Sequence, residues 1–560
     1  MADRAAEDAP LRFESHPDRY RHWKLQFPAE HGGAVARLVM DVDEGGGLRP
    51  PGTPGGYPLK LNSYDLSVDV ELADALQRIR FEHPEVRALV VTGGKDRIFC
   101  SGANIYMLGS SSHGFKVNFC KYTNETRLAL EEMSAESGIP TLAALNGTAS
   151  GGGYELALAC DEVVLVEDGS SVVSLPEAPL LGVLPGTGGL TRVVDKRQVR
   201  RDLADAFSTM AEGLRGKRAV EWGLVDEAPP RARFGEAVGR RLEAMLARSR
   251  RAPFRPVPLA PLEARRSAQG TEYRFVSLRV DEAARTAALT VRAPDGPEPE
   301  TPGALAEAGA GAWALRAFRE LDDALLDLRF NHPAAGVVAV RAEGSAAAVL
   351  GVDRMLAAHR GDGLVREVVL HMRRVLKRLD LSSRSFFALV EPGSCFAGSL
   401  LELALASDRV YMKDAAATPP SLALSPMNAG PLAASNGLSR LRTRFLREPG
   451  RAAQLLESPG PLDTAAALAA GLVTFAPDDL DWDEEVRIAI EERASLSPDA
   501  MTGMEASLRF AGPETLETKI FGRLSAWQNW IFQRPNAVGE RGALTLYGRP
   551  ERPHFDWRRC

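Results

Sequence analysis

The 560-residue sequence lacks the features that mark secreted, metal-binding and membrane-spanning proteins. Its five cysteines are odd in number, widely spaced and without a CxxC pair, which favours reduced thiols over a disulfide framework. Its nine histidines form no HExxH or similar pair, so we expect no metal site. No apolar run approaches the roughly 18 residues that span a bilayer, and the acidic N-terminus lacks the apolar core of a signal peptide.

An excess of basic charge is missing too. The formal net charge is −6, which provides neither a basic surface for nucleic acid nor a polybasic anchor for anionic membranes. With 45% hydrophobic and 25% charged residues, the composition is typical of a globular protein, and the length favours two or three domains. We therefore expect a cytoplasmic protein that binds neither nucleic acid nor membranes.

What the sequence does contain is a long internal duplication. Residues 72–84 (LADALQRIRFEHP) reappear at 321–333 (LDDALLDLRFNHP), and YELALACD at 154–161 returns as LELALASD at 401–408. The order and the spacing are preserved, which indicates that a domain of about 200–250 residues is duplicated. The proline-rich stretch 252–270 reads as a linker between the copies. We expect three parts, at residues 1–255, 256–475 and 476–560.

Strand and helix patterns alternate within the first copy, which predicts an α/β fold with its ligand at the C-terminal ends of the strands. Strands are expected at 34–42, 86–94, 141–147 and 162–166, with helices at 70–80 and 117–134.

Two strand ends carry turns of small residues, in RIFCSGAN at 97–104 and NGTASGGG at 146–153. Glycine lets a ligand approach the backbone, and the first N–H groups of a following helix remain free to donate. Two such turns can each supply one N–H to a single carbonyl oxygen, which is the geometry of an oxyanion hole.

Three segments in order, FCSGAN, NGTASGGGYELALACD and SLPEAPLLGVLPGTGG, resemble the signature segments of the crotonase (enoyl-CoA hydratase/isomerase) superfamily. The resemblance implies an α/β fold of two tandem crotonase-like (ββα superhelix) domains, the second degenerate, with a C-terminal helical extension. It implies that the N–H groups of Ala103 and Gly152 bind the thioester oxygen of an acyl-CoA. It also implies that Glu155 and Glu177 are the two catalytic acids.

Elementary chemistry supports the pair of glutamates. Two carboxylates near one water in a partly dry pocket have their pKa values pushed apart, so that one acts as base while the other donates a proton. Alternatively, Glu155 is a first-turn carboxylate favoured by the helix dipole, and Glu177 is an exposed loop residue. The combination with the glycine turns favours catalysis. Which glutamate is the acid and which the base stays open.

The resemblance further implies a set of residues that bind the substrate and its CoA arm: Ala103, Asn104, Ile105, Tyr106, Gly151 and Gly152. Most family members have Asp in place of Asn104, and Tyr106 stands where a phosphate-pairing Lys is often found. CoA is part of the substrate, so we expect no separate cofactor.

Cys120, in the helix after the first turn, is either a small buried hydrophobe, the commoner case, or a residue that moves a proton or orients the substrate. Tyr122 and Asn124 on the same segment are weaker candidates.

The second copy differs at these positions. Its GGG segment reads Gly-Ser-Leu, and Val352 stands where the first copy has Ala103. Glu402 matches Glu155, but no acid matches Glu177. We expect this copy to keep the fold and to lack an oxyanion hole.

The tandem arrangement, with HPDRYRHWKL at 16–25 and the aromatic-rich segment 527–557, resembles the benzoyl-CoA-dihydrodiol lyase (2,3-epoxybenzoyl-CoA dihydrolase) family nearly end to end. The resemblance implies that the enzyme opens the ring of 2,3-epoxy-2,3-dihydrobenzoyl-CoA with two waters, in aerobic benzoate degradation. The products are 3,4-didehydroadipyl-CoA semialdehyde and formate.

Two alternatives stay open. One is an enoyl-CoA hydratase that acts on straight-chain acyl-CoA. The other is a non-catalytic acyl-CoA-binding or assembly protein, against which the intact glutamate pair argues. We also expect a homo-oligomer, with a dimer favoured.

Overall fold

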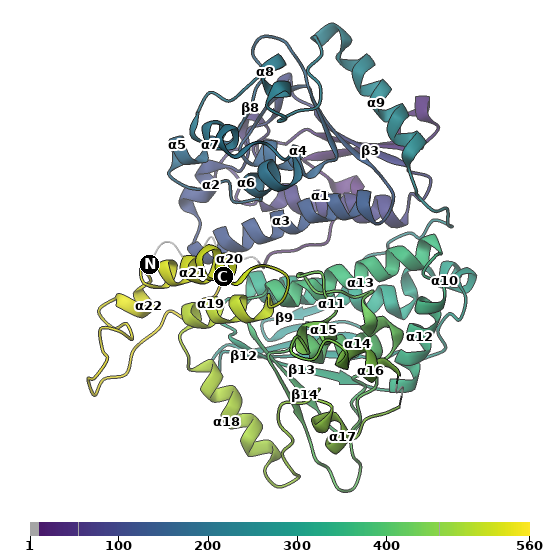
Figure 1. The fold of residues 1–560 in the computed structure, drawn as a ribbon, viewed down its shortest axis with the longest axis vertical. Helices are drawn as coiled ribbons and strands as arrows, with labels where there is room; N and C mark the ends of the chain where they lie inside the picture. The colour runs from purple at the N-terminus through teal and green to yellow at the C-terminus, as the bar shows by residue number, and fades with distance from the viewer. Residues whose placement is uncertain (1–9, 54, 458–459) are drawn as a thin grey trace. The chain divides into compact units, whose positions relative to one another are not determined.

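The computed structural model describes residues 10–53, 55–457 and 460–560, which form two compact units, Met1–Leu259 and Ala260–Cys560 (Figure 1). Residues 1–9, the start of the acidic N-terminus in which we expected no signal peptide, lie outside this description. Residues 476–560 lie within unit 2. In the described parts of the chain, no helix has both the length and the apolar character needed to cross a membrane.

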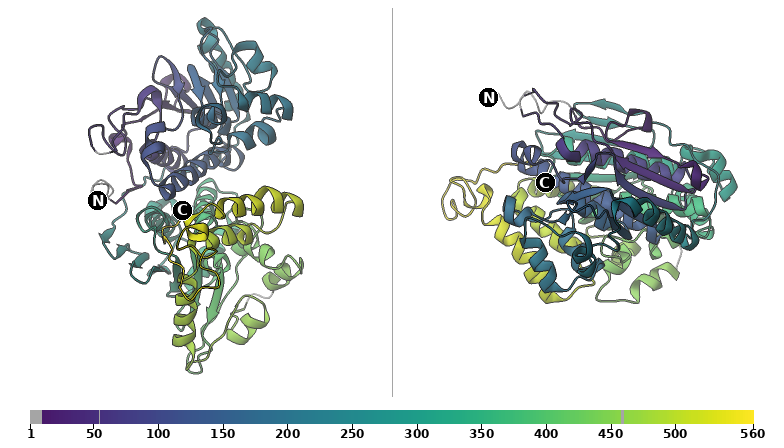
Figure 2. Two further views of the ribbon diagram at one scale, coloured as in Figure 1. Left: turned by 90° about the vertical axis from the view of Figure 1, so that its left-hand side faces the viewer. Right: turned by 90° about the horizontal axis from the view of Figure 1, so that it is seen from above.

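Unit 1 is built on a five-stranded sheet in the order β1-β2-β3-β5-β7, seen as purple and blue strands in the right panel of Figure 2. Its edge strand β1 (Trp23–Gln26) runs antiparallel to β2, and the other four strands are parallel. These four are β2 (Val35–Met40), β3 (Ala88–Gly93), β5 (Thr141–Leu145) and β7 (Glu162–Leu165). They lie at the apolar runs from which strands were predicted, because a parallel sheet covered on both faces needs nearly continuous apolar sequence.

Helices cover both faces of this sheet. On one face α1 (Leu66–Phe81) and α3 (His113–Ala135) run side by side (Figure 1). The side chain of Asp65 caps α1 by accepting the Ser67 N–H. On the other face α9 (Phe234–Arg248) packs its Leu242 and Met245 onto strand residues. The strand residues of this cluster are Val35, Ala88, Val90, Leu142, Ala144 and Val164.

A second, smaller sheet of three parallel strands carries the two turns that were predicted from their small residues. Its order is β4 (Arg97–Cys100), β6 (Gly147–Ser150) and β8 (Val173–Ser174). Cys100 pairs with Ala149, and Ala149 pairs with Val173. The buried helix α4 (Gly152–Ala159) begins immediately after β6. The remaining helices of unit 1 are α2 (Ile105–Ser110), α5 (Glu177–Leu181), α6 (Gly189–Thr191), α7 (Arg201–Thr209) and α8 (Gly216–Glu221).

Unit 2 repeats the path of the large sheet. Its seven strands are ordered β15-β14-β13-β12-β11-β10-β9, with β12 to β15 parallel and β11 antiparallel to β12, as β1 is to β2. Their bounds are β9 (Arg265–Ser267), β10 (Gly270–Glu272), β11 (Val276–Asp281), β12 (Thr286–Arg292), β13 (Val337–Glu343), β14 (Ser385–Val390) and β15 (Arg409–Met412).

The duplicated sequence segments lie on equivalent helices. Residues 72–84 cover the end of α1, and residues 321–333 cover the end of α11 (Trp313–Asn331). Residues 154–161 lie on α4 and 401–408 on α14 (Gly398–Ala406). As α3 lies beside α1, α13 (Gly363–Leu381) lies beside α11. The helix α18 (Trp482–Ala494) packs on β13, β14 and β15 as α9 packs on the strands of unit 1.

The small sheet has no counterpart among the described residues of unit 2. Where unit 1 follows β3 with β4 and its turn, unit 2 follows β13 with a helix, α12 (Ala346–Ala358). The other helices of unit 2 before α18 are α10 (Pro302–Ala308), α15 (Arg440–Arg444), α16 (Arg451–Glu457) and α17 (Thr464–Ala469). After α18 the chain forms α19 (Pro498–Arg509), α20 (Leu516–Lys519), α21 (Ser525–Ile531) and α22 (Pro535–Val538), yellow in Figures 1 and 2.

Candidate active site

The register of the small sheet brings three predicted site residues to one edge. Cys100 and Ala149 are paired, and Ala103 and Gly152 each follow their paired residue by three positions. On the next strand, Glu177 follows the paired residue Val173 by four positions. Because the three strands are parallel, all three residues emerge at the C-terminal edge of the sheet, where open α/β sheets bind their ligands.

The two expected oxyanion donors lie in adjoining turns. The N–H groups of Ala103 and Gly152 donate to no acceptor among the described residues. Gly102 has a φ of +95°, and a Cβ atom at this position would lie 3.1 Å from the backbone nitrogen of Gly152. Since the N–H of Gly152 is the first of α4, it has no partner within the helix. Two unused donors therefore lie close together, as binding of a single oxygen requires.

The three consecutive glycines each make room for a different neighbour. A Cβ atom at Gly151, whose φ is +53°, would lie 2.6 Å from Glu177 Oε1. At Gly152 it would lie 2.0 Å from the hydroxyl oxygen of Tyr64, and at Gly153 it would lie 2.4 Å from the backbone oxygen of Cys100. These separations are too short for any side chain. The glycines thus bring a carboxylate, a hydroxyl and a strand against the start of α4.

Glu155 is buried in the first turn of α4, and its carboxylate is held by one loop. Oε1 accepts the N–H groups of Thr187 at 3.0 Å and of Gly189 at 2.7 Å. Oε2 accepts the hydroxyl of Thr187. These three donors explain how a carboxylate can be buried in an apolar helix, and they fix its orientation.

That loop is itself anchored on both sides. The side-chain amide of Asn124 on α3 donates to the backbone oxygen of Gly186 at 3.0 Å, and Arg192 donates to that of Thr187 at 2.9 Å. Gly188 has a φ of +89°, so the turn favours glycine there. Asn124, a weaker candidate for chemistry, therefore supports the loop that holds Glu155.

Glu177 lies across Gly151 in a different electrostatic situation. Burial and, to a smaller extent, the negative charge of Glu155 together raise its pKa from 4.5 to about 7. Its Oε2 is buried and has no hydrogen-bond partner among the described residues. A carboxyl group with such a pKa is partly protonated at neutral pH and can donate or accept a proton there.

Cys120 lies near this pair. A Cβ atom at Gly186 would lie 3.6 Å from its Sγ. Burial raises the pKa of the Cys120 thiol to about 11, with a further contribution from Glu155, so it is a neutral thiol at physiological pH. Tyr122 is buried beside the ring of Phe13, 5.4 Å between ring centroids.

The residues expected to bind the CoA arm divide into two groups. The side chain of Asn104 is used within the protein: it caps α2 by accepting the Met107 N–H, and it donates to Pro58 and Ser63. Ile105 and Tyr106 begin α2 with exposed side chains, Tyr106 being 72% exposed. These two remain available to a ligand.

In unit 2 the equivalent helix start binds a carboxylate of the chain itself. Ser399, the counterpart of Gly152, donates its N–H to Asp353 Oδ2 at 2.7 Å. The hydroxyl of Ser425 donates to the same oxygen at 2.7 Å. Asp353 comes from α12, is fully buried, and has its pKa raised to about 6 by burial. The donor that is unused in unit 1 is therefore occupied here.

Glu402, the counterpart of Glu155, is an ion-pair partner. It accepts from Asn428 at 2.7 Å and from Arg440 at 3.2 Å, and Arg440 also pairs with Asp380. Glu402 and Arg440 are buried, and Asp380 is partly buried. Glu402 is thus part of a structural network of hydrogen bonds and ion pairs.

Sequence reasoning missed Tyr64, Thr187 and Asp353. The glycines flanking Thr187 in PGTGG were a usable signal, because two neighbouring glycines mark a turn that can present N–H groups. Tyr64 and Asp353 gave no such signal, since their partners are distant in sequence.

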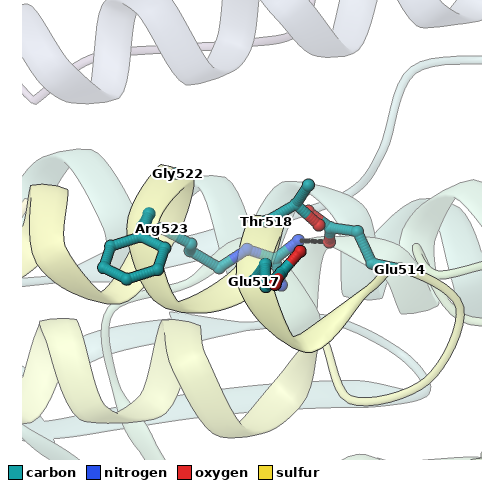
Figure 3. A pocket seen from close by; sticks show the side chains of 6 residues that line it. Glu514, Glu517, Thr518, Gly522 and Arg523 are labelled. Atoms are coloured by element: carbon teal, nitrogen blue, oxygen red, sulfur yellow. Dashed lines mark hydrogen bonds and ion pairs between the residues drawn. The ribbon is translucent and has the colours of Figure 1, made fainter.

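A shallow surface pocket lies elsewhere, on α20 and the turn that follows it in unit 2 (Figure 3). An ion pair of Arg523 with Glu514 crosses it, and Phe521 is exposed beside it. It includes none of the predicted site residues. Among the described residues, no three His, Cys, Asp or Glu side chains are grouped as a metal site would require.

Comparisons with known proteins show which families the chain resembles. The sequence profile of the enoyl-CoA hydratase/isomerase family matches residues 57–256. A benzoyl-CoA-dihydrodiol lyase of Aromatoleum evansii is 56% identical over 549 residues, covering 98% of this chain and 97% of that protein. The fatty acid oxidation complex subunit alpha of Shewanella loihica (strain ATCC BAA-1088 / PV-4) is 35% identical over 199 residues, covering 35% of this chain and 25% of that protein.

Among solved structures, an enoyl-CoA hydratase from Geobacillus kaustophilus HTA426 is 28% identical with a TM-score of 0.34, covering 41% of this chain and 75% of that one.

Unit 1, with its matching profile and paired turns, has the α/β fold of the enoyl-CoA hydratase/isomerase class. The whole chain belongs to the benzoyl-CoA-dihydrodiol lyase family.

Proposed function

We propose that the protein is a ring-opening lyase that converts 2,3-epoxy-2,3-dihydrobenzoyl-CoA and two waters into 3,4-didehydroadipyl-CoA semialdehyde and formate. The reaction balances with water alone: two ring C–C bonds are broken, because the carbon that leaves as formate was bonded to two ring neighbours, and the two waters supply the added oxygen and hydrogen atoms. CoA is carried by the substrate, and no separate cofactor enters the proposal. The 56% identity to a benzoyl-CoA-dihydrodiol lyase along nearly the whole chain supports this assignment.

The observation that carries the proposal is the grouping of two unused N–H donors with two unlike carboxylates. We assign the donors of Ala103 and Gly152 to the thioester oxygen. A polarised thioester draws electrons from the conjugated ring, and the donors stabilise the negative charge that develops on the oxygen. Ile105 and Tyr106, exposed beside the first turn, are assigned to the CoA arm.

The two glutamates receive different roles because their surroundings differ. Glu155, fixed by three donors, is assigned as the base that activates water. Glu177, with a pKa of about 7 and an unpartnered oxygen, is assigned as the acid that delivers a proton during epoxide opening. Cys120 is a neutral thiol bordering the pair, and we assign it a role in shaping the acyl pocket.

For the second half of the chain we propose a degenerate crotonase-like domain at about residues 256–475, followed by a helical extension at 476–560. The catalytic domain would then span residues 1–255. The repeated sheet order and the equivalent helices support the common ancestry of the two domains. The contact of Asp353 with Ser399 supports the loss of the oxyanion hole.

A homo-oligomer, with a dimer favoured, stays a prediction.

The test is a comparison of two substrates. The protein is incubated with the 2,3-epoxide of benzoyl-CoA and, separately, with crotonyl-CoA, and formate and hydrated product are measured. We expect one formate for each epoxide consumed and only trace hydration of crotonyl-CoA. Efficient hydration of crotonyl-CoA without formate from the epoxide would favour a straight-chain hydratase, and inactivity towards both would favour a binding protein.

A further inference from the structure

The hydroxyl of Tyr64 is a buried polar group that makes no hydrogen bond within the described structure. Tyr64 is 1% exposed, and its hydroxyl has no hydrogen-bond partner among the described residues. Buried hydroxyl groups nearly always have a partner, because desolvation without one costs free energy. Phenylalanine would fill the same space without this cost. An unpartnered buried hydroxyl therefore points to a partner that arrives from outside.

The main chain of Tyr64 is joined to the first oxyanion turn. Its N–H donates to the backbone oxygen of Gly102 at 3.0 Å, and its own backbone oxygen accepts the N–H of Asn104 at 2.8 Å. These bonds flank Ala103, whose N–H is one of the two unused donors. The backbone of Tyr64 is thus fixed relative to this turn, and a shift of one would shift the other.

The ring of Tyr64 is held in one direction. The guanidinium carbon of Arg127 lies 5.3 Å from its centroid, and the ring of Phe119 lies 5.9 Å away. Arg127 is itself fixed by a buried ion pair with Asp69. Burial raises the pKa of the Tyr64 hydroxyl well above its usual value, so the group keeps its proton and acts as a donor.

The hydroxyl lies against Gly152. A Cβ atom on Gly152 would be only 2.0 Å from it, whereas the Cβ position of the neighbouring Gly151 faces Glu177. The hydroxyl therefore lies against the residue that carries the second unused N–H. The proton-transferring carboxylate of Glu177 lies against the preceding residue.

We infer that the Tyr64 hydroxyl is a third hydrogen-bond donor to the thioester oxygen, alongside the N–H groups of Ala103 and Gly152. The inference rests on the proposed function, which puts that oxygen at the two turns. Tyr64 keeps its proton throughout, and its hydrogen bond strengthens as negative charge develops on the oxygen. It accelerates the reaction without forming or breaking a covalent bond.

The test uses Tyr64→Phe, which keeps the ring, and Tyr154→Phe as a matched control. Tyr154 is also buried, but its hydroxyl donates to the backbone oxygen of Leu224 at 2.7 Å. The first readout is the infrared carbonyl stretch of bound benzoyl-CoA labelled with ¹³C at the thioester carbon, a probe that has no epoxide and needs no turnover. The second is the kinetics of epoxide conversion.

We expect the wild-type protein to lower the frequency of the carbonyl stretch relative to free benzoyl-CoA, and Tyr64→Phe to lose part of that shift. The kcat of Tyr64→Phe should fall about 10²-fold, with KM within a few-fold of wild type, as for the loss of other oxyanion donors. Tyr154→Phe should keep the full shift in frequency. Incorporating 3-fluorotyrosine at position 64, which makes the hydroxyl more acidic, should increase the shift.

A wild-type shift that survives unchanged in Tyr64→Phe, together with an unchanged kcat, would overturn this inference and leave the proposed function standing. A wild-type protein that binds benzoyl-CoA without shifting the stretch would overturn the proposed oxyanion hole, and the role of Tyr64 with it.

Discussion

Individual side chains in unit 1 are held in states that favour chemistry over stability. Glu177 illustrates this, because its buried carboxyl group has a pKa near 7 and an oxygen without a partner in the part of the chain that the structure describes. A residue selected for stability alone would be neutral or paired. The sequence identified Glu155 and Glu177 as a pair, since both lie in recognisable segments. It could not show that three donors from one loop hold Glu155, because those contacts join residues more than thirty positions apart.

Replacing Glu177 by Gln should abolish turnover and stabilise the fold. Burial, followed by repulsion from Glu155, raises its pKa from 4.5 in the unfolded chain to about 7 in the folded one. The stability associated with this group is therefore fully present below about pH 4.5 and is lost as the pH rises through 7. At 1.36 kcal/mol per pH unit, Glu177→Gln should be more stable than wild type by up to about 3 kcal/mol above pH 7.

Urea denaturation at pH 4.5 and pH 8, with turnover measured in parallel, checks this prediction. The two proteins should have equal stability at the lower pH. A Gln variant that is less stable at pH 8, or that turns over within a few-fold of wild type, would contradict the assignment.

The pH dependence of turnover should report the same group. If Glu177 delivers a proton, kcat/KM falls about tenfold per pH unit above pH 7, because only the protonated acid is active. The measurement is a pH–rate profile from pH 6 to 9 with the epoxide. A kcat/KM that rises through pH 7 would contradict this assignment and would indicate that Glu177 is the base and Glu155 the acid.

At the scale of elements, the site depends on where strands end. The parallel strands of the large sheet were predictable from their apolar runs, and the two glycine-bearing turns from their composition. The two-residue strand β8 was not, because two residues carry no periodicity. In unit 2 the helix α12 stands where unit 1 has β4. Aligning the two copies residue by residue did not reveal this change from strand to helix. The alignment pointed to Val352, whereas the adjacent Asp353 reaches the helix start.

Alanine substitutions in the GGG turn should separate folding from activity. Gly153→Ala places a Cβ against the backbone of Cys100 and should cost about 1–3 kcal/mol of stability. Gly152→Ala meets the buried ring end of Tyr64, so it should cost a similar amount of stability and in addition lose most turnover by displacing the hydroxyl.

Gly239 on α9 is the matched control, because nothing lies within 4 Å of its Cβ position and Ala there should be neutral or stabilising. Thermal unfolding and kcat of the three variants provide the comparison. Gly152→Ala with full activity would show that the turn tolerates a Cβ and that the hydroxyl position is unimportant.

Removing the internal carboxylate of unit 2 should affect stability alone. Asp353→Ala leaves the Ser399 N–H and the Ser425 hydroxyl without their buried acceptor, which should cost about 1–3 kcal/mol for each group left unpaired. The rate of epoxide conversion per folded molecule should stay at the wild-type value. The relevant measurements are chemical denaturation and kcat, and a large loss of kcat in a folded variant would argue for a catalytic part of unit 2.

The whole chain combines the proposed thioester site of unit 1 with a second unit whose equivalent helix start is occupied by the carboxylate of Asp353. The fold class of unit 1 and the repeated helices followed from the sequence, because strand patterns and repeated segments can be read directly from the order of the residues. The contacts that replace the site in unit 2 could not be predicted from the sequence, since they join buried side chains that are distant in sequence and meet only in the folded protein. Glu402 shows this: it keeps the residue type of Glu155 but pairs with Arg440.

The most direct test of the central claim is formate release from the 2,3-epoxide of benzoyl-CoA by four proteins side by side: wild type, Glu155→Gln, Glu177→Gln and Glu402→Gln. We predict stoichiometric formate from wild type, a rate lower by orders of magnitude in the first two variants, and a near wild-type rate in folded Glu402→Gln. Loss of formate release in folded Glu402→Gln, or its persistence in both variants of unit 1, would contradict the account.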